Sequence, residues 1–185
     1  IGLTTIEFQT KTQCKLPGHF AAQNVDTRIF APVAGIAKPE PIIRQKINID
    51  NNGNPQGFAP KLEANRNYAL LLKSPASLAR KVDFKAEGGT TILDPIFLLS
   101  GDISPATLPD GKINALDKSE LIRQWSLVKD VARTGDFNGD NRINSIDYSC
   151  MRANFNAIDE VYTPPTSSQV LNPDASASPS PSPSP

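Results

Sequence analysis

Residues 135–147 have the sequence Gly135-Asp136-Phe137-Asn138-Gly139-Asp140-Asn141-Arg142-Ile143-Asn144-Ser145-Ile146-Asp147. Calcium takes roughly six to eight oxygen ligands, and a twelve-residue loop supplies them from positions 1, 3, 5, 7, 9 and 12, with a sharp turn at position 6. Asn141 holds position 6, and asparagine tolerates the left-handed turn almost as well as glycine. This stretch therefore predicts a calcium site whose ligands are Asp136, Asn138, Asp140, the Arg142 backbone carbonyl, Asn144 and Asp147.

An earlier stretch of the chain repeats this pattern. It begins Gly101-Asp102 and closes as Asp110-Gly111-Lys112-Ile113-Asn114-Ala115-Leu116-Asp117. When the two copies are aligned on their last aspartate, Ser119 matches Ser149, Leu121 matches Met151 and Trp125 matches Phe155. Since the apolar residues that follow each copy have helical spacing, the repeat predicts two units, each a calcium loop followed by one helix.

The first copy departs from the simple loop by a four-residue insertion between Asp102 and Asp110. Position 3 is therefore ambiguous, and Ser104 is its nearest candidate. The second half of the loop is intact. We expect a second calcium site here, with the ligands Asp102, Ser104, Asp110, the Lys112 backbone carbonyl, Asn114 and Asp117. The alternative is a vestigial loop kept for packing.

The pair of loops, over about residues 100–160, resembles a dockerin domain. The resemblance implies two calcium loops that each have only an exiting helix, packed with near two-fold symmetry. It also implies binding to cohesin modules of extracellular scaffold proteins. Family contacts with cohesin centre on loop positions 10 and 11, which are Ala115-Leu116 and Ser145-Ile146 in this chain. Many cellulosomal dockerins have a Ser/Thr pair there, and this chain does not.

Residues 1–99 contain several short apolar runs separated by proline and glycine, a pattern typical of a small β-sandwich. Expected strands include residues 4–9, 43–49, 68–72, 82–84 and 91–93. Ile6 and Phe8 lie on one face of the first run, which either pairs within its own sandwich or adds to a neighbouring sheet. The segment is similar to the prealbumin-like, carboxypeptidase-regulatory-like sandwiches that precede dockerins in bacterial surface proteins, and these carry no catalytic residues.

The last stretch, residues 163–185, is rich in serine and proline and has almost nothing to bury, so we expect it to be extended. The predicted organisation is thus a β-sandwich over 1–99, a dockerin-like calcium-binding domain over 100–162 and a Ser/Pro tail over 163–185. The predicted fold class is mainly β with a small all-α unit.

Composition excludes several classes of protein. The net charge is zero, which argues against a general nucleic-acid binder, and no apolar run is long enough for a membrane span. The single histidine, His19, makes a histidine-based catalytic centre a poor prediction. A glycosidase pair drawn from Glu7, Glu40, Glu63 and Glu87 is disfavoured because the segment is short and has few aromatic side chains. We therefore expect no enzymatic activity.

The two cysteines, Cys14 and Cys150, allow one bridge within the chain. Two free buried thiols or a bridge between chains are the alternatives. The start at Ile1, without a signal-peptide pattern, favours a processed product of a secreted precursor over a trimmed fragment.

These features together predict a secreted, extracellular or cell-surface protein that is not an enzyme and acts by calcium-stabilised protein–protein association. Our main hypothesis is self-assembly into a surface fibre, through the N-terminal strand or the tail. The alternative is docking onto a cohesin of an extracellular scaffold, and the third is a fragment of a polysaccharide-degrading enzyme. Neither nucleic-acid binding nor membrane insertion is expected.

Overall fold

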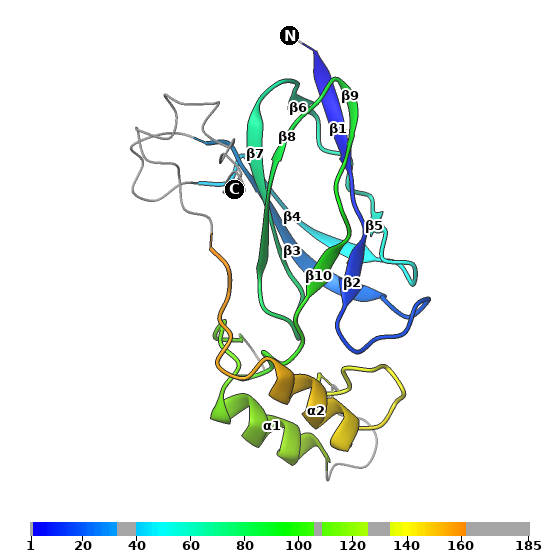
Figure 1. Ribbon diagram of the computed structural model, residues 1–185, viewed down its shortest axis with the longest axis vertical. Helices are drawn as coiled ribbons and strands as arrows, with labels where there is room; N and C mark the ends of the chain where they lie inside the picture. The colour runs from blue at the N-terminus through cyan, green and yellow to red at the C-terminus, as the bar shows by residue number, and fades with distance from the viewer. Residues whose placement is uncertain (1, 33–39, 106–108, 126–133, 162–185) are drawn as a thin grey trace, which may run out of the picture.

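The computed structural model describes residues 2–32, 40–105, 109–125 and 134–161 (Figure 1). All strands in these ranges end before residue 99, and both helices begin after residue 114. This order confirms the predicted mainly β fold with a small helical unit. The predicted Ser/Pro tail lies outside the described residues. Among the described helices, none is long and apolar enough to cross a membrane.

One layer of the sandwich is a five-stranded antiparallel sheet. Its strands lie in the order β5 (Pro55–Gln56), β4 (Ile43–Ile49), β3 (Ala22–Phe30), β7 (Asn67–Lys73) and β8 (Arg80–Lys85). The central strand β3 is absent from our predicted strands. Its inward-facing positions are Val25, Thr27 and Ile29, all buried, and the polar residue in the middle weakens the alternation. The Thr27 hydroxyl is satisfied locally, since it donates to the Val25 carbonyl at 3.2 Å.

The facing layer brings the first strands of the chain beside the last ones. Strand β1 (Leu3–Glu7) pairs antiparallel with β6 (Leu62–Glu63) and parallel with β9 (Gly89–Ile92). Strand β2 (Thr10–Thr12) pairs parallel with β10 (Ile96–Leu98). Ile6 and Phe8 are buried in the core between the two layers. The N-terminal strand therefore completes its own sandwich, which is one of the two arrangements that the sequence left open.

The helical unit consists of α1 (Ala115–Trp125) and α2 (Ser145–Ala153), which lie side by side at one end of the sandwich (Figure 1). Leu121 and Met151, which the repeat aligns, are both fully buried. They belong to a small second core that also contains Leu78, from the connection between β7 and β8. Because this core takes a side chain from the sandwich, the division of the chain at residues 99 and 100 stays a prediction.

A disulfide joins the two units. Cys14, just after β2, is bonded to Cys150 in α2, so the bridge lies within the chain and spans 136 residues of sequence. Beside it, the Asn154 side-chain amide donates to the Ser100 carbonyl at 2.8 Å and to the Gln13 side chain. Of the alternatives left open by the sequence, the structure has the intramolecular bridge.

Replacing both cysteines by serine (C14S/C150S) should lower the free energy of unfolding by about 2–5 kcal/mol, because a long closed loop restricts the unfolded chain. Urea unfolding in calcium would measure the change. A reducing agent should produce the same shift in the wild-type protein and none in the variant. Equal stability of the oxidised and reduced wild-type protein would contradict this expectation.

Candidate metal centre

The second predicted calcium loop is organised around Asp147, which is 0% exposed. Its Oδ1 accepts the backbone N–H groups of Phe137 at 2.8 Å and Asn138 at 3.3 Å. Its Oδ2 accepts the N–H of Asn144 at 2.9 Å, which forms one half of a capping box at the start of α2. One buried carboxylate therefore joins the beginning of the loop to the first turn of the helix.

Asp136, at position 1, holds the central turn of the loop. Its Oδ1 accepts the N–H of Gly139 and its Oδ2 that of Asn141, both at 2.9 Å. Asn141 has a φ of 63°, the left-handed conformation expected at position 6. Burial raises the pKa of Asp136; its backbone hydrogen bonds oppose the rise, and the nearby carboxylates of Asp147 and Asp140 add to it. A cation in the loop would reverse this effect of crowded negative charge.

The remaining predicted side-chain ligands of the second loop also lie along the turn. The Asn138 Oδ1 accepts the N–H of Asp140 at 3.0 Å, and the Asp140 Oδ1 accepts the N–H of Arg142 at 2.8 Å. The Asn144 Oδ1 accepts the N–H of Ile146 at 2.7 Å, and the Asn144 side chain also accepts the backbone N–H of Asp147, which is the other half of the capping box. Each of these side chains thus has a fixed orientation before any ion is considered.

The first predicted loop has the same framework. Asp117, also 0% exposed, accepts the N–H groups of Ile103 at 2.8 Å and Ser104 at 2.9 Å through Oδ1, and that of Asn114 at 2.8 Å through Oδ2. Ser104 therefore has the same place as Asn138 in the second loop, which supports Ser104 at position 3. Residues 106–108 of the insertion lie outside the described residues.

The middle of the first loop also matches the second. Gly111, at position 6, has a φ of 77°, and its N–H donates to the Asp102 Oδ2 at 3.1 Å. The Asp110 Oδ1 accepts the N–H of Lys112 at 3.0 Å. A Cβ atom on Gly111 would lie 2.6 Å from the Asp159 Oδ2, so the φ value favours glycine or asparagine and a larger residue would also displace the Asp159 side chain.

The two loops differ at position 1. The Asp102 Oδ1 is buried and accepts no hydrogen bond from the described residues. In the second loop the corresponding oxygen binds the Gly139 N–H, whereas the first loop has Pro109 at that place, and proline has no N–H. The Asp102 Oδ2 instead accepts from the Lys73 ammonium at 2.6 Å. Burial raises the pKa of Asp102 to about 6, although Lys73 opposes the rise.

The donor set of each loop suits a hard cation. In the part of the chain that the structure describes, no three His, Cys, Asp or Glu side chains gather closely enough to hold a metal ion. An ion in either loop therefore also needs the amide and backbone carbonyl oxygens of the motif. Oxygen-only donors fit calcium rather than a softer metal, and the unpartnered buried Oδ1 of Asp102 is an available ligand of this kind.

Two charged residues near the first loop were missed by the sequence analysis. Lys73, the last residue of β7, also donates to both Asp159 oxygens, at 2.8 and 2.9 Å. The Asp159 Oδ1 additionally accepts the backbone N–H of Ala79 at 2.8 Å. Neither residue belongs to the repeated motif, and they are 86 positions apart, so no local pattern in the sequence connects them.

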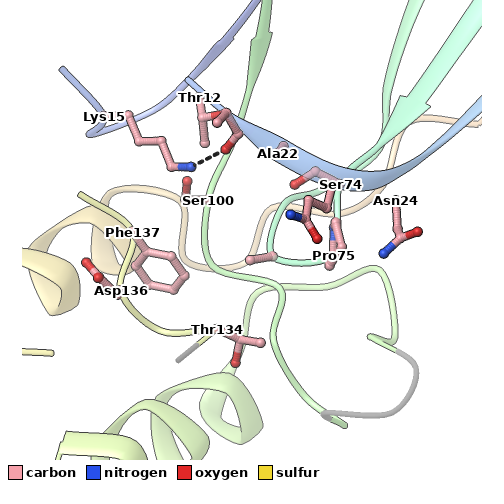
Figure 2. Close-up of a pocket in the computed structure, with 13 residues that line it drawn as sticks. Thr12, Lys15, Ala22, Asn24, Ser74, Pro75, Ser100, Thr134, Asp136 and Phe137 are labelled. Carbon is pink, nitrogen blue, oxygen red and sulfur yellow. Dashed lines mark hydrogen bonds between the residues drawn. The ribbon is translucent and has the colours of Figure 1, made fainter. Parts of the chain in front are cut away.

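A cleft of about 470 Å³ lies between the second loop and the sandwich (Figure 2). Asp136 and Phe137 line it from the loop, and Lys15 lines it from the sandwich. The Lys15 ammonium donates to the Ala21 carbonyl at 2.8 Å, which is the dashed line in Figure 2. Burial lowers the pKa of Lys15, and the Asp136 carboxylate opposes that change.

The residues at loop positions 10 and 11, where the resemblance places the contacts with cohesin, lie on the surface. Ala115-Leu116 and Ser145-Ile146 are all exposed, at equivalent places in the first turns of α1 and α2. Leu116 is 58% exposed and Ile146 is 54% exposed. Large apolar side chains at this exposure, repeated on two helices, mark a candidate protein-binding surface.

The helical unit and the whole chain are similar to known proteins. Residues 109–156 match the family model of the dockerin type I domain. A chain in an N-terminal interface mutant of the type II cohesin–X–dockerin complex from Acetivibrio cellulolyticus is 20% identical, with 86% of this chain and 98% of that chain covered and a TM-score of 0.59. A chain in the C-terminal interface mutant of the same complex is 18% identical, with coverage of 84% and 97% and a TM-score of 0.61. The comparison with curated proteins gave no match.

The two solved structures show that the fold of the sandwich and helical unit occurs in cohesin–X–dockerin complexes. The family match starts at residue 109, after the insertion, and so leaves out Asp102 of the first loop. Residues 109–156 are therefore similar to dockerin type I domains, as the paired loops and helices predict, and calcium is the ion that this family binds.

Proposed function

We propose that this protein is a non-catalytic, calcium-dependent docking module whose helical unit binds a cohesin. The observation that carries the proposal is the duplicated framework around Asp117 and Asp147, which presents the same exposed positions on two helices. The dockerin family match and the cohesin–X–dockerin neighbours support a docking role. The choice of a cohesin as the partner is our proposal.

Calcium in each loop is proposed to be held by the residues that the motif predicts. For the second loop they are Asp136, Asn138, Asp140, the Arg142 carbonyl, Asn144 and Asp147, and for the first Asp102, Ser104, Asp110, the Lys112 carbonyl, Asn114 and Asp117. Calcium supplies positive charge to carboxylates that are crowded or buried. Metal binding and folding are coupled in domains of this size, so the ion also stabilises the helix pair.

The surface chemistry favours an apolar contact with the partner. Leu116 and Ile146 occupy position 11 of their loops, where a Ser/Thr pair would offer hydroxyl groups. Buried apolar anchors provide much of the binding energy in protein interfaces, whereas exposed polar groups provide little. We therefore propose a cohesin whose contact face is apolar opposite these two residues.

The cohesin alternative is better supported than our main hypothesis of self-assembly. The N-terminal strand, which self-assembly would use, has its partners β6 and β9 within the same sandwich. The tail, the other candidate, lies outside the described residues. For the enzyme hypothesis, neither His19 nor any of the four glutamates considered lines the cleft at the second loop. The solved neighbours belong to cohesin complexes.

The disulfide at the junction between the two units agrees with an extracellular setting. The Cys14–Cys150 disulfide is of a kind that persists in oxidising compartments and is rare in the cytosol. Dockerin modules also occur in extracellular cellulosome components. We propose on these grounds that the protein acts outside the cell.

Removal of calcium should melt part of the helical structure. We expect a chelator to weaken the helical circular dichroism band at about 222 nm. Adding calcium back should restore the band. The variant D136N should lose one of two equivalents of bound calcium in isothermal titration calorimetry while α2 keeps its cap. In contrast, D147A should also lose the Asp147 half of the capping box, which lowers stability by about 0.5–2 kcal/mol. An unchanged spectrum in chelator would contradict the calcium proposal.

Charge placed on both exposed position-11 residues should abolish docking. We expect L116D/I146D to weaken binding to a cognate cohesin by at least about 30-fold, the effect of losing an interface hot spot of about 2 kcal/mol. Surface plasmon resonance against a panel of cohesins, in calcium, would measure it. The matched control is I92D, because Ile92 is an exposed apolar residue on β9, away from the helices.

The docking proposal fails if no cohesin in the panel binds the wild-type protein in calcium. Oligomers or filaments of the purified protein, seen by light scattering and electron microscopy, would then return support to self-assembly. Equal loss of binding in I92D and L116D/I146D would show that the helices are not the contact surface.

A further inference from the structure

The sandwich places a lysine directly on the first calcium loop. Lys73 ends β7, and its side chain reaches the helical unit with only 24% of its surface exposed. Its ammonium lies 2.6 Å from the Asp102 Oδ2 and 2.8 Å from the nearer oxygen of Asp159. Both carboxylates are separate in the sequence from β7, so this contact exists only because the two units are docked.

The second loop has no equivalent cation on its first aspartate. Within the described residues, no Lys or Arg nitrogen lies within 4.0 Å of Asp136. Lys15 is the sandwich lysine that faces that loop across the cleft, and its ammonium donates to the Ala21 carbonyl instead (Figure 2). The loops therefore share a framework of hydrogen bonds and differ in the charge beside position 1.

This difference has a direct electrostatic consequence. A calcium ion held by Asp102 would share this carboxylate with the Lys73 ammonium, which already binds Oδ2. Two positive charges a few ångströms apart repel, and a partly buried site screens the repulsion weakly. Among the described residues, no ammonium binds the Asp136 carboxylate in this way, and Lys15 acts on it only across the cleft.

We propose that Lys73 is a built-in counter-ion that lowers the calcium affinity of the first loop below that of the second. The two sites then fill in order, the second loop before the first. Without calcium, Lys73 offsets part of the negative charge of the buried Asp102 and the adjacent Asp159 and keeps the helical unit against the sandwich. This inference rests on the calcium sites of the proposed function and adds an order of filling to them.

An effect of the Lys73 charge can be told from an effect of its packing, because loss of the charge should change calcium affinity and stability in opposite directions. Loss of the ammonium should raise the calcium affinity of the first loop. The same loss should lower stability without calcium, since it leaves a buried carboxylate without its partner. If Lys73 only packed the two units together, its removal would lower both the affinity and the stability.

The test is a calcium titration by calorimetry on the full chain, in the D136N background, so that the remaining heat comes from the first loop. We expect K73M to tighten that site by at least about fivefold, the factor equivalent to one pair of unit charges 4 Å apart in water. K73R, which keeps the charge, should stay close to the parent. K85M is the matched control, because Lys85 is an exposed lysine on the adjacent strand β8.

A second variant covers the case in which K73M does not fold without calcium. K73M/D159N removes one charge of each sign and leaves Asp102 as the only carboxylate of the pair. It should fold and show a smaller gain in affinity than K73M. Unchanged or weaker calcium binding in the lysine-free variants, or an equal gain in K85M, would overturn the proposal.

The outcome also distinguishes this inference from the calcium sites themselves. If the wild-type protein binds no calcium, both the sites and the role of Lys73 are wrong. If it binds two ions with equal affinity and K73M does not change the first site, only the role of Lys73 is wrong.

Discussion

The structure of the helical unit depends on a buried carboxylate in each loop. Asp117 and Asp147 are each 0% exposed, and each accepts backbone N–H groups from the start of its loop and from the residue that caps its helix. A buried charge is unfavourable unless hydrogen bonds or an opposite charge compensate it. The backbone supplies part of that compensation, and a cation is the natural source of the rest. Loop, helix start and ion site are therefore one structural element.

The junction between the units follows from the same need to compensate buried groups. Leu78 fills the small helical core from the sandwich side, and Lys73 provides charge for Asp102 and Asp159. The disulfide adds a covalent restraint at α2. A core built from so few residues buries little apolar surface on its own. The helical unit therefore depends on its contacts with the sandwich for part of its stability. The two units are better described as one docked pair than as independent modules on a linker.

The sequence was most informative where the structure is local. The left-handed turn at Asn141 and the burial of Leu121 and Met151 follow from local spacing, and the structure has them as expected, whereas the calcium ligands stay a prediction. It was least informative where residues distant in the chain meet. The parallel pairing of β1 with β9, the approach of Cys14 to Cys150 and the contact of Lys73 with Asp102 are all long-range, and no local pattern encodes them. Strand β3 was missed for a different reason, since Thr27 faces inward where an apolar residue would have signalled a strand.

A repeated sequence does not imply repeated chemistry at its sites. The two loops keep the same hydrogen bonds through a four-residue insertion, yet Pro109 removes one donor from Asp102 where Gly139 supplies one to Asp136. The sandwich then binds a lysine directly to Asp102, whereas Lys15 acts on Asp136 from across the cleft. Leu116 and Ile146 directly precede Asp117 and Asp147, so each exposed contact residue lies in the helical turn that its own loop fixes. If Leu116 and Ile146 form the docking surface that we propose, an ion that orders one loop also orders the residue beside it, and unequal loops make the two halves of that surface unequal as well.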